Sequence, residues 1–232
     1  MKIKYAMILA AGFGKRMRPL TSDTPKPLLK IGNESLLDRA INFLQKNGVE
    51  KIIINTHYLA EKIKKYISEK KFKVKILISD ESNLLLDTGG GVKLGSKKFG
   101  NNPFFVINPD TLWTKNYHKE LISVANLYLK YKKPCLLLVN KEFSFDKSFS
   151  GDFNLNKNYI SKDTENKFIY TGLQIINRNY LNFMENKVFS MNEVLKKLID
   201  EKKLIGLESK QNFYHINTVE SYKRISSLNI TF

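Results

Sequence analysis

The chain alternates short apolar runs with longer segments whose apolar residues have helical spacing, and this alternation limits the choice of fold. The strand-like runs cover residues 4–10, 51–56, 73–79, 103–108 and 134–140. The helical segments cover residues 35–47, 59–69, 90–98 and 117–130. Continuous apolar strands separated by helices are typical of parallel sheets that are buried on both faces. The sequence therefore predicts an α/β chain with a Rossmann-like, mostly parallel central sheet and helices on both faces.

The latter third of the chain has a less regular pattern. We expect small β additions here, namely hairpin-like strands over the binding site at 151–153, 163–167 and 168–176, and a further strand at 212–218. Helices are expected at 191–201 and 219–228. No repeat, low-complexity linker or Gly/Ser-rich hinge divides the 232 residues, so a single domain over 1–232 is predicted.

A glycine-rich loop with basic residues follows the first predicted strand. Gly12 and Gly14 allow the backbone to approach a ligand closely, and Lys15 and Arg16 indicate that this ligand is anionic. A dinucleotide fingerprint would need a glycine where Met17 stands, and a P-loop would need serine or threonine in place of Arg16. The loop is therefore a phosphate-binding candidate of another kind.

Two charged residues farther along the chain complete the candidate site. Lys26 lies between two prolines that restrict its backbone, and a rigidly placed ammonium suits a phosphate. Asp110 follows the buried strand at 103–108, where a carboxylate is costly unless a partner such as a metal ion pairs with it; a helix-capping role is the alternative. Because ligands bind beyond the carboxyl ends of parallel strands, the loop and Asp110 are expected to share one site.

Charge and composition exclude some classes of function. The net charge of +17 raises a nucleic-acid-binding role, but the lysines are spread along the chain as on solvated helix faces, so no nucleic-acid partner is predicted. No apolar run approaches the roughly 20 residues that span a bilayer, so no membrane partner is predicted either. The single cysteine, Cys135, lies in an apolar run, which indicates a buried structural thiol and suits a cytoplasmic location.

Residues 9–21 and 25–29 resemble the signature of the sugar-1-phosphate nucleotidylyltransferases, the NDP-sugar pyrophosphorylases. Segments 87–91, 151–153, 170–174 and 215–220 are similar to the short bacterial members, among them the uridylyltransferases for N-acetylmuramate 1-phosphate. The resemblance implies a nucleotide-diphospho-sugar transferase fold, with a nucleotide-binding half at 1–115 and a sugar-binding half at 116–232. It also implies a reaction in which a nucleoside triphosphate and a sugar 1-phosphate give an NDP-sugar and pyrophosphate.

The resemblance also implies a role for individual residues. Arg16 and Lys26 are expected to be catalytic, and Asp110 with His215 to bind Mg²⁺, with Mn²⁺ as the alternative ion. Relatives usually have Asp or Asn where His215 stands, and glycine where Pro109 stands. The residues expected to bind the nucleotide are Ala10, Ala11, Gly12, Gly14, Lys15, Thr88 and Gly89. The residues expected to bind the sugar are Asn108, Asp152 and Thr171.

Several points stay open at this stage. UTP and N-acetylmuramate 1-phosphate are the first expectation for the substrates, as in a cell-wall recycling enzyme. The alternatives are a cytidylyl-, guanylyl- or thymidylyltransferase for another sugar 1-phosphate or for phosphocholine, and a non-catalytic sensor of NDP-sugars. Both a monomer and a homodimer are compatible with the sequence.

Overall fold

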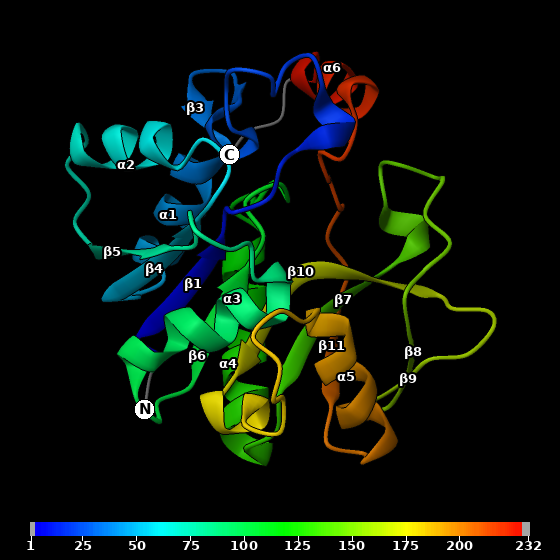
Figure 1. Ribbon diagram of the computed structural model, residues 1–232. Coiled ribbons are helices and arrows are strands. Elements are labelled where there is room, and N and C mark those ends of the chain that lie inside the picture. Colours follow the sequence, from blue (N-terminus) through cyan, green and yellow to red (C-terminus); the bar gives the residue numbers. More distant parts are fainter. Residues whose placement is uncertain (1–2, 229–232) are drawn as a thin grey trace.

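The computed structural model describes residues 3–228, and within them nine strands form one sheet in the order β5-β4-β1-β6-β10-β7-β11-β9-β8 (Figure 1). The strands of this sheet have the bounds β1 Tyr5–Leu9, β4 Lys51–Thr56, β5 Lys75–Asp80, β6 Phe104–Ile107, β7 Cys135–Asn140, β8 Asn154–Asn156, β9 Tyr159–Ser161, β10 Phe168–Ile176 and β11 Ile205–Ser209. A separate two-stranded ribbon consists of β2 Lys30–Ile31 and β3 Glu34–Ser35.

The sheet is mostly parallel. Strands β5, β4, β1 and β6 run in one direction, and β7 and β11 are parallel to each other. Strand β10 lies between β6 and β7 and runs antiparallel to both, so β6, β7 and β11 share one direction. The carboxyl ends of β1, β4, β5 and β6 therefore meet at the same edge, as the alternating pattern predicts.

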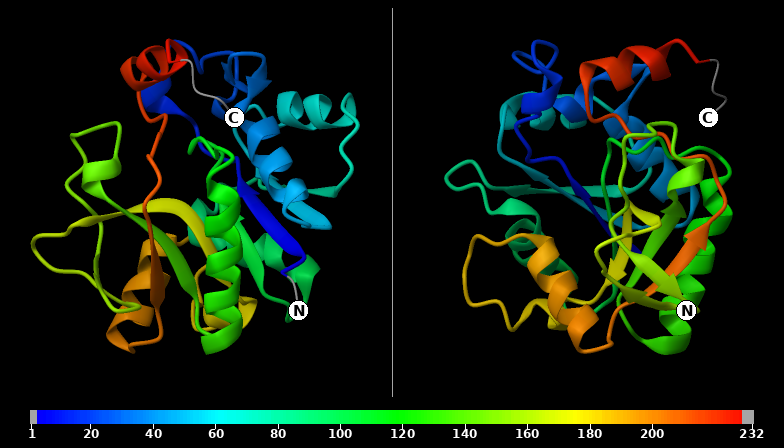
Figure 2. Two further views of the ribbon diagram at one scale, coloured as in Figure 1. Left: turned by 180° about the vertical axis from the view of Figure 1, so that it is seen from behind. Right: turned by 90° about the vertical axis from the view of Figure 1, so that its right-hand side faces the viewer.

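Helices cover both faces of the sheet. The helices of the described chain have the bounds α1 Leu36–Lys46, α2 Ala60–Ser68, α3 Asp87–Gly95, α4 Tyr117–Tyr131, α5 Met191–Asp200 and α6 Val219–Ser226. Apolar residues of α1, α2 and α4 pack on one face, and those of α3 and α5 pack on the other. Accordingly, α3 and α5 lie in front of the sheet in Figure 1, whereas α4 lies in front when the molecule is seen from behind (Figure 2). The predicted fold class is confirmed.

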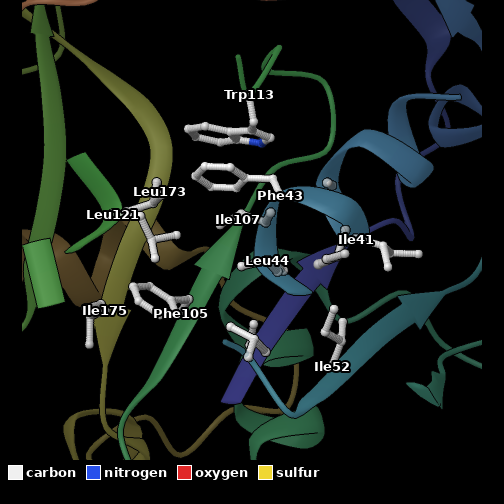
Figure 3. Close-up of a cluster of buried hydrophobic side chains, with 14 of the residues drawn as sticks. Ile41, Phe43, Leu44, Ile52, Phe105, Ile107, Trp113, Leu121, Leu173 and Ile175 are labelled. Atoms are coloured by element: carbon white, nitrogen blue, oxygen red, sulfur yellow. The ribbon is translucent and has the colours of Figure 1, made fainter. Parts of the chain in front are cut away.

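The hydrophobic cluster between the sheet and helices α1, α2 and α4 also fixes one end of β6. Phe43 of α1 stacks on Trp113 with ring centroids 5.4 Å apart and planes inclined by 11° (Figure 3). The indole Nε1 of Trp113 donates a hydrogen bond of 3.0 Å to the carbonyl oxygen of Asn108, directly after the strand. Burial of these aromatic rings, worth several kcal/mol by area, thus holds the segment that carries Asp110.

Two predictions for the latter third are wrong. The strand expected at 212–218 is an extended segment that makes only isolated bridges, Thr111 with His215 and Ser144 with Phe213, whereas the unpredicted β11 is a full strand of the sheet. The strand expected at 168–176 is confirmed as β10, but it lies inside the sheet and not over the site. Residues 163–167 form no strand and 151–153 contribute only an isolated bridge at Phe153, whereas the unpredicted β8–β9 hairpin lies at the outer edge of the sheet. Among the described residues, no helix is long and apolar enough to span a membrane.

Candidate active site

A pocket of about 590 Å³ opens at the carboxyl ends of the parallel strands. It brings together segments that are far apart in the sequence: the glycine loop after β1, the residues after β6 and the start of α3. The residues that line it are Leu9, Ala10, Ala11, Gly12, Gly14, Lys15, Arg16, Met17, Lys26, Pro27, Leu36, Asn55, Leu85, Asp87, Thr88, Asn108, Pro109, Asp110, Val188 and Asn217.

The glycine loop is held by its own backbone and by one threonine. Gly14 has a φ of 63°, in the left-handed region that disfavours side chains, and a Cβ there would lie 3.3 Å from the Cβ of Lys26. Thr21 donates its hydroxyl to the carbonyl oxygen of Gly14 over 2.8 Å. A single 3₁₀ turn, Lys15–Met17, follows; Met17 is buried, whereas Lys15 and Arg16 are exposed on the pocket. The loop therefore presents two cations from a fixed backbone.

Lys26 and Asp110 form an ion pair in this pocket. The ammonium donates to Oδ2 of Asp110 over 2.5 Å, and the two side chains are only 14% and 19% exposed. Burial by itself would raise the pKa of Asp110, but the charge of Lys26 and the neighbouring His215 outweigh it and lower that pKa to about 2. Asp110 is therefore ionised at neutral pH.

His215 lies behind Asp110, outside the pocket lining described above. Its Nδ1 is 3.7 Å from Oδ1 of Asp110 and 3.5 Å from the hydroxyl of Thr111. The imidazole stacks on Phe213 with centroids 5.8 Å apart and planes inclined by 12°. Burial lowers the pKa of His215 below its usual value, and the positive charges of Lys26 and Arg16 lower it further, against the opposing effect of Asp110. The ring is thus neutral at neutral pH.

The start of α3 forms another wall of the pocket. Asp87 and Thr88 line it, and the Thr88 hydroxyl accepts a hydrogen bond of 2.9 Å from the amide of Met191. Gly89 is buried and its amide donates to the carbonyl oxygen of Phe189 over 3.0 Å. A Cβ on Gly89 would come within 2.4 Å of the Phe189 ring, so packing alone requires a glycine here.

Comparison with known proteins decides the family. A family model described as nucleotidyl transferase matches residues 5–138, more than half of the chain. The chain belongs to the nucleotidyl transferase family. The resemblance seen in the sequence is thereby confirmed. The enzyme class that it implies, a sugar-1-phosphate nucleotidyltransferase, is confirmed with it.

Individual relatives of this nucleotidyl transferase support the same family. This chain is 30% identical over 221 residues to N-acetylmuramate alpha-1-phosphate uridylyltransferase of Caulobacter vibrioides. The similarity covers 92% of this chain and 91% of that protein. The chain is 32% identical over 212 residues to mannose-1-phosphate guanyltransferase 2 of Candida glabrata, covering 85% of this chain but only 57% of that protein. A crystal structure of a putative glucose-1-phosphate thymidylyltransferase from Bacillus anthracis has the same fold, with a TM-score of 0.81, 18% identity, and coverage of 98% of this chain and 96% of that one.

Most of the residues expected to contact the substrates do lie in the transferase pocket. These are Ala10, Ala11, Gly12, Gly14, Lys15, Arg16, Lys26, Thr88, Asn108 and Asp110. Gly89, Asp152, Thr171 and His215 are not among its lining residues. The carboxylate of Asp152 accepts from the amide of Tyr170 over 2.8 Å, and the buried hydroxyl of Thr171 donates to the carbonyl oxygen of Leu137 over 2.9 Å.

Two polar lining residues were missed by the sequence analysis. Asn55 belongs to β4 and is paired in register with Leu9. Asn217 follows His215 by two residues, and its Oδ1 is buried without a hydrogen-bond partner in the described chain. The signal for Asn55 was available, because it is a polar residue near the carboxyl end of an apolar parallel strand. Nothing in the local pattern distinguishes Asn217 from its neighbours.

The residues present fit a magnesium ion that takes few protein ligands. The second carboxylate oxygen of Asp110, Oδ1, is buried and has no hydrogen-bond partner in the described chain, and neither has Oδ1 of Asn217. Within residues 3–228 no group of three or more His, Cys, Asp or Glu side chains could hold a metal ion. Magnesium in such enzymes is held by one or two carboxylates together with substrate phosphates and water, so a single free carboxylate oxygen is compatible with it.

Proposed function

We propose that this protein joins UTP to N-acetylmuramate 1-phosphate and releases pyrophosphate. The main support for the transfer reaction is the ion pair between Lys26 and Asp110. It lies in a pocket that also holds the cations of the glycine loop. The relative of Caulobacter vibrioides supports this pair of substrates, because the similarity covers nine-tenths of both chains. We also propose that the enzyme acts in the cytoplasm, in the recycling of cell-wall sugars.

The chemistry consists of one in-line displacement. An oxygen of the sugar phosphate forms a bond to the α-phosphorus of the nucleotide, the bond from that phosphorus to the β-phosphate oxygen breaks, and pyrophosphate leaves with the electron pair. Both reactants are anions, so their mutual repulsion opposes the approach. Catalysis then consists of positioning and of neutralising negative charge.

The cations of the pocket have separate tasks in this proposal. Arg16 binds the β- and γ-phosphates with its forked donors and stabilises the leaving pyrophosphate. Lys26 lies between the α-phosphate and the sugar phosphate and draws them together, with its position fixed by Asp110. Asp110 would also hold Mg²⁺, since its oxygen Oδ1 has no hydrogen-bond partner among the described residues, and the ion would supply further positive charge for the phosphates. His215 supports Asp110 from behind.

A second pair of substrates is favoured by a specific observation. The guanyltransferase of Candida glabrata is 32% identical over most of this chain, although it is much longer. GTP with mannose 1-phosphate is therefore the alternative.

A pyrophosphate-release assay tests the proposal. UTP, CTP, GTP and dTTP are each combined with N-acetylmuramate, N-acetylglucosamine, glucose and mannose 1-phosphates and with phosphocholine, in Mg²⁺ and again in Mn²⁺. We expect turnover with UTP and N-acetylmuramate 1-phosphate, reduced roughly 10²- to 10³-fold in Lys26→Ala and unchanged in Lys119→Ala, which removes an exposed lysine of α4. If only another combination is turned over, that combination is the substrate pair and the proposed pair is wrong. If no combination is turned over, the result favours a non-catalytic sensor of NDP-sugars.

A further inference from the structure

A chain of hydrogen bonds connects two walls of the pocket through a pair of buried side chains. The amide of Ala10 donates to Oδ1 of Asn55 over 2.9 Å, and Nδ2 of Asn55 donates to Oε1 of Glu81 over 2.8 Å. The amide of Leu86 donates to the other carboxylate oxygen of Glu81 over 3.2 Å. Asn55 and Glu81 are only 2% and 3% exposed. We call this pair of side chains the Asn55–Glu81 bridge.

The segments at the two ends of the bridge face the same pocket. Ala10 and the two residues after it line the pocket from the glycine loop. Leu86 lies between the lining residues Leu85 and Asp87, directly before Thr88. The bridge therefore joins the backbone of the glycine loop to the segment at the start of α3.

The main chain of Glu81 is fixed independently of its side chain. Its amide donates to the carbonyl oxygen of Thr56 over 2.8 Å, and its carbonyl oxygen lies 2.7 Å from Nδ1 of His57. Helix α3 packs directly on the bridge, since a Cβ on Gly91 would lie 2.7 Å from Oε1 of Glu81 and 2.8 Å from Nδ2 of Asn55. The carboxylate joins this fixed point to the amide of Leu86, whereas the carbonyl oxygen of Leu86 accepts from the amide of Phe189 over 3.3 Å.

We infer that Asn55 and Glu81 are positioning residues that set the width of the slot for the nucleotide base, between the glycine loop and the segment 86–88. The inference rests on the proposed function, because it assigns that slot to the base. Neither residue holds the phosphates directly: Lys26 lies on another segment, and the turn that carries Arg16 is held separately by the hydroxyl of Thr21 on the carbonyl oxygen of Gly14. Loosening the bridge should therefore weaken nucleotide binding through the base.

The polarity of the bridge makes the inference testable. Both of its ends are backbone N–H donors, so the link between them must accept at each end and donate in the middle, as an amide paired with a carboxylate does. Asn55→Asp places two carboxyl groups against each other, and once both are ionised in alkaline solution no hydrogen remains between them. Glu81→Gln forces an N–H group against another N–H group at one of the three hydrogen bonds. The double variant Asn55→Asp/Glu81→Gln restores all three hydrogen bonds with nearly unchanged volume, because the carboxylate then accepts from Ala10 and from the new glutamine.

The decisive experiment measures binding by calorimetry with two probes. The first probe is the nucleoside triphosphate that the wild type binds best among UTP, CTP, GTP and dTTP, and the second is inorganic tripolyphosphate, which has the phosphates but no base. We expect Glu81→Gln, and Asn55→Asp in alkaline solution, to lose roughly 10-fold in affinity for the nucleotide, because only a fraction of each variant then has a slot of the right width, and to keep their affinity for tripolyphosphate. The double variant should recover to within about threefold of the wild type.

Gly91→Ala gives a second, independent variant if a single variant fails to fold. Its Cβ displaces the bridge without removing a hydrogen-bonding group, and we expect the same selective loss of nucleotide affinity. Folded single variants that bind the nucleotide normally, a loss that is equal for both probes, or a folded double variant without recovery would each overturn the inference. If the wild type binds none of the four nucleotides, the proposed function fails, and this outcome is distinct from the others.

Discussion

The ammonium of Lys26 lies 2.5 Å from a carboxylate oxygen of Asp110, although 84 residues separate them in the chain. Lys26 comes from a short turn that follows Pro25, and Asp110 from the segment after β6. Their meeting depends on the parallel arrangement of β1 and β6, which brings both segments to one edge of the sheet. The pair orders the lysine in the pocket and leaves Oδ1 of Asp110 free for other chemistry.

Replacing this carboxylate tests its role in orienting the lysine. Asp110→Asn keeps the shape of the side chain but removes the negative charge that holds the ammonium, and it replaces one of the two carboxylate oxygens with an NH₂ group that cannot bind Mg²⁺. We expect the turnover number to fall roughly 10²- to 10³-fold, measured by pyrophosphate release. Asp200→Asn, at the exposed end of α5, is the matched control and should leave the rate unchanged. Wild-type turnover in Asp110→Asn would contradict the role given to the pair.

Removing divalent ions tests the fit of magnesium to the pocket. The bound nucleotide brings several negative charges next to Asp110, and the cations of the pocket are expected to be insufficient without a metal ion. Excess EDTA should abolish turnover, and Mg²⁺ added beyond the chelator should restore it. Full turnover in EDTA would show that Lys15, Arg16 and Lys26 neutralise the phosphates alone.

Two glycines of the site should respond differently to alanine. A Cβ on Gly89 would clash with the Phe189 ring, whereas a Cβ on Gly12 has nothing within 4 Å and enters open space. Gly89→Ala should lower the free energy of unfolding by about 1–3 kcal/mol, as overpacking does, in urea denaturation. Gly12→Ala should leave that free energy nearly unchanged and weaken nucleotide binding, because Gly12 lines the pocket. The reverse pattern would contradict the structural reason given for each glycine.

The buried thiol of Cys135 should make stability depend on pH in alkaline solution. Burial raises the pKa of Cys135 from 9.0 to about 12, so the unfolded chain ionises this group first as the pH rises. Well below pH 9 the thiol is protonated in both the folded and the unfolded chain. As the pH rises from 9 towards 12 the thiol ionises in the unfolded chain first, and this ionisation favours unfolding. Between pH 8.5 and 10.5 the wild type should lose about 1–2 kcal/mol relative to Cys135→Ala, measured by urea denaturation at each pH. Parallel pH dependence of the two proteins would contradict this burial effect.

Much of the fold was predictable because its signals are local. The apolar runs that became β1, β4, β6 and β7 are continuous, and parallel topology then brings their carboxyl ends together. Strand β11 was missed because Gly206 and the polar Glu208 and Ser209 break its apolar run. Ile160 packs against Gly206, and pairing with β7 supplies what the local sequence lacks.

The candidate site was predictable where a residue's place follows from a strand end, as for Arg16, Asp110 and Asn108. The hydrogen-bond partners of Asp152 and Thr171 are backbone groups of strands. No local pattern shows that the Thr171 hydroxyl donates to a backbone carbonyl oxygen inside the sheet. Their assignment to the sugar stays a prediction, as does the place of His215 in metal binding. The Asn55–Glu81 bridge needs the register of β4 with β1 and β5, which only the folded chain provides.

The most direct test of the central claim is to follow the phosphorus atoms of one reaction mixture. Wild-type protein, Mg²⁺, UTP and N-acetylmuramate 1-phosphate are observed by ³¹P NMR. The account predicts that signals of a diphosphate ester and of pyrophosphate appear in equal amounts as UTP and the sugar phosphate disappear. Unchanged substrates, or hydrolysis of UTP with the sugar phosphate left intact, would contradict it.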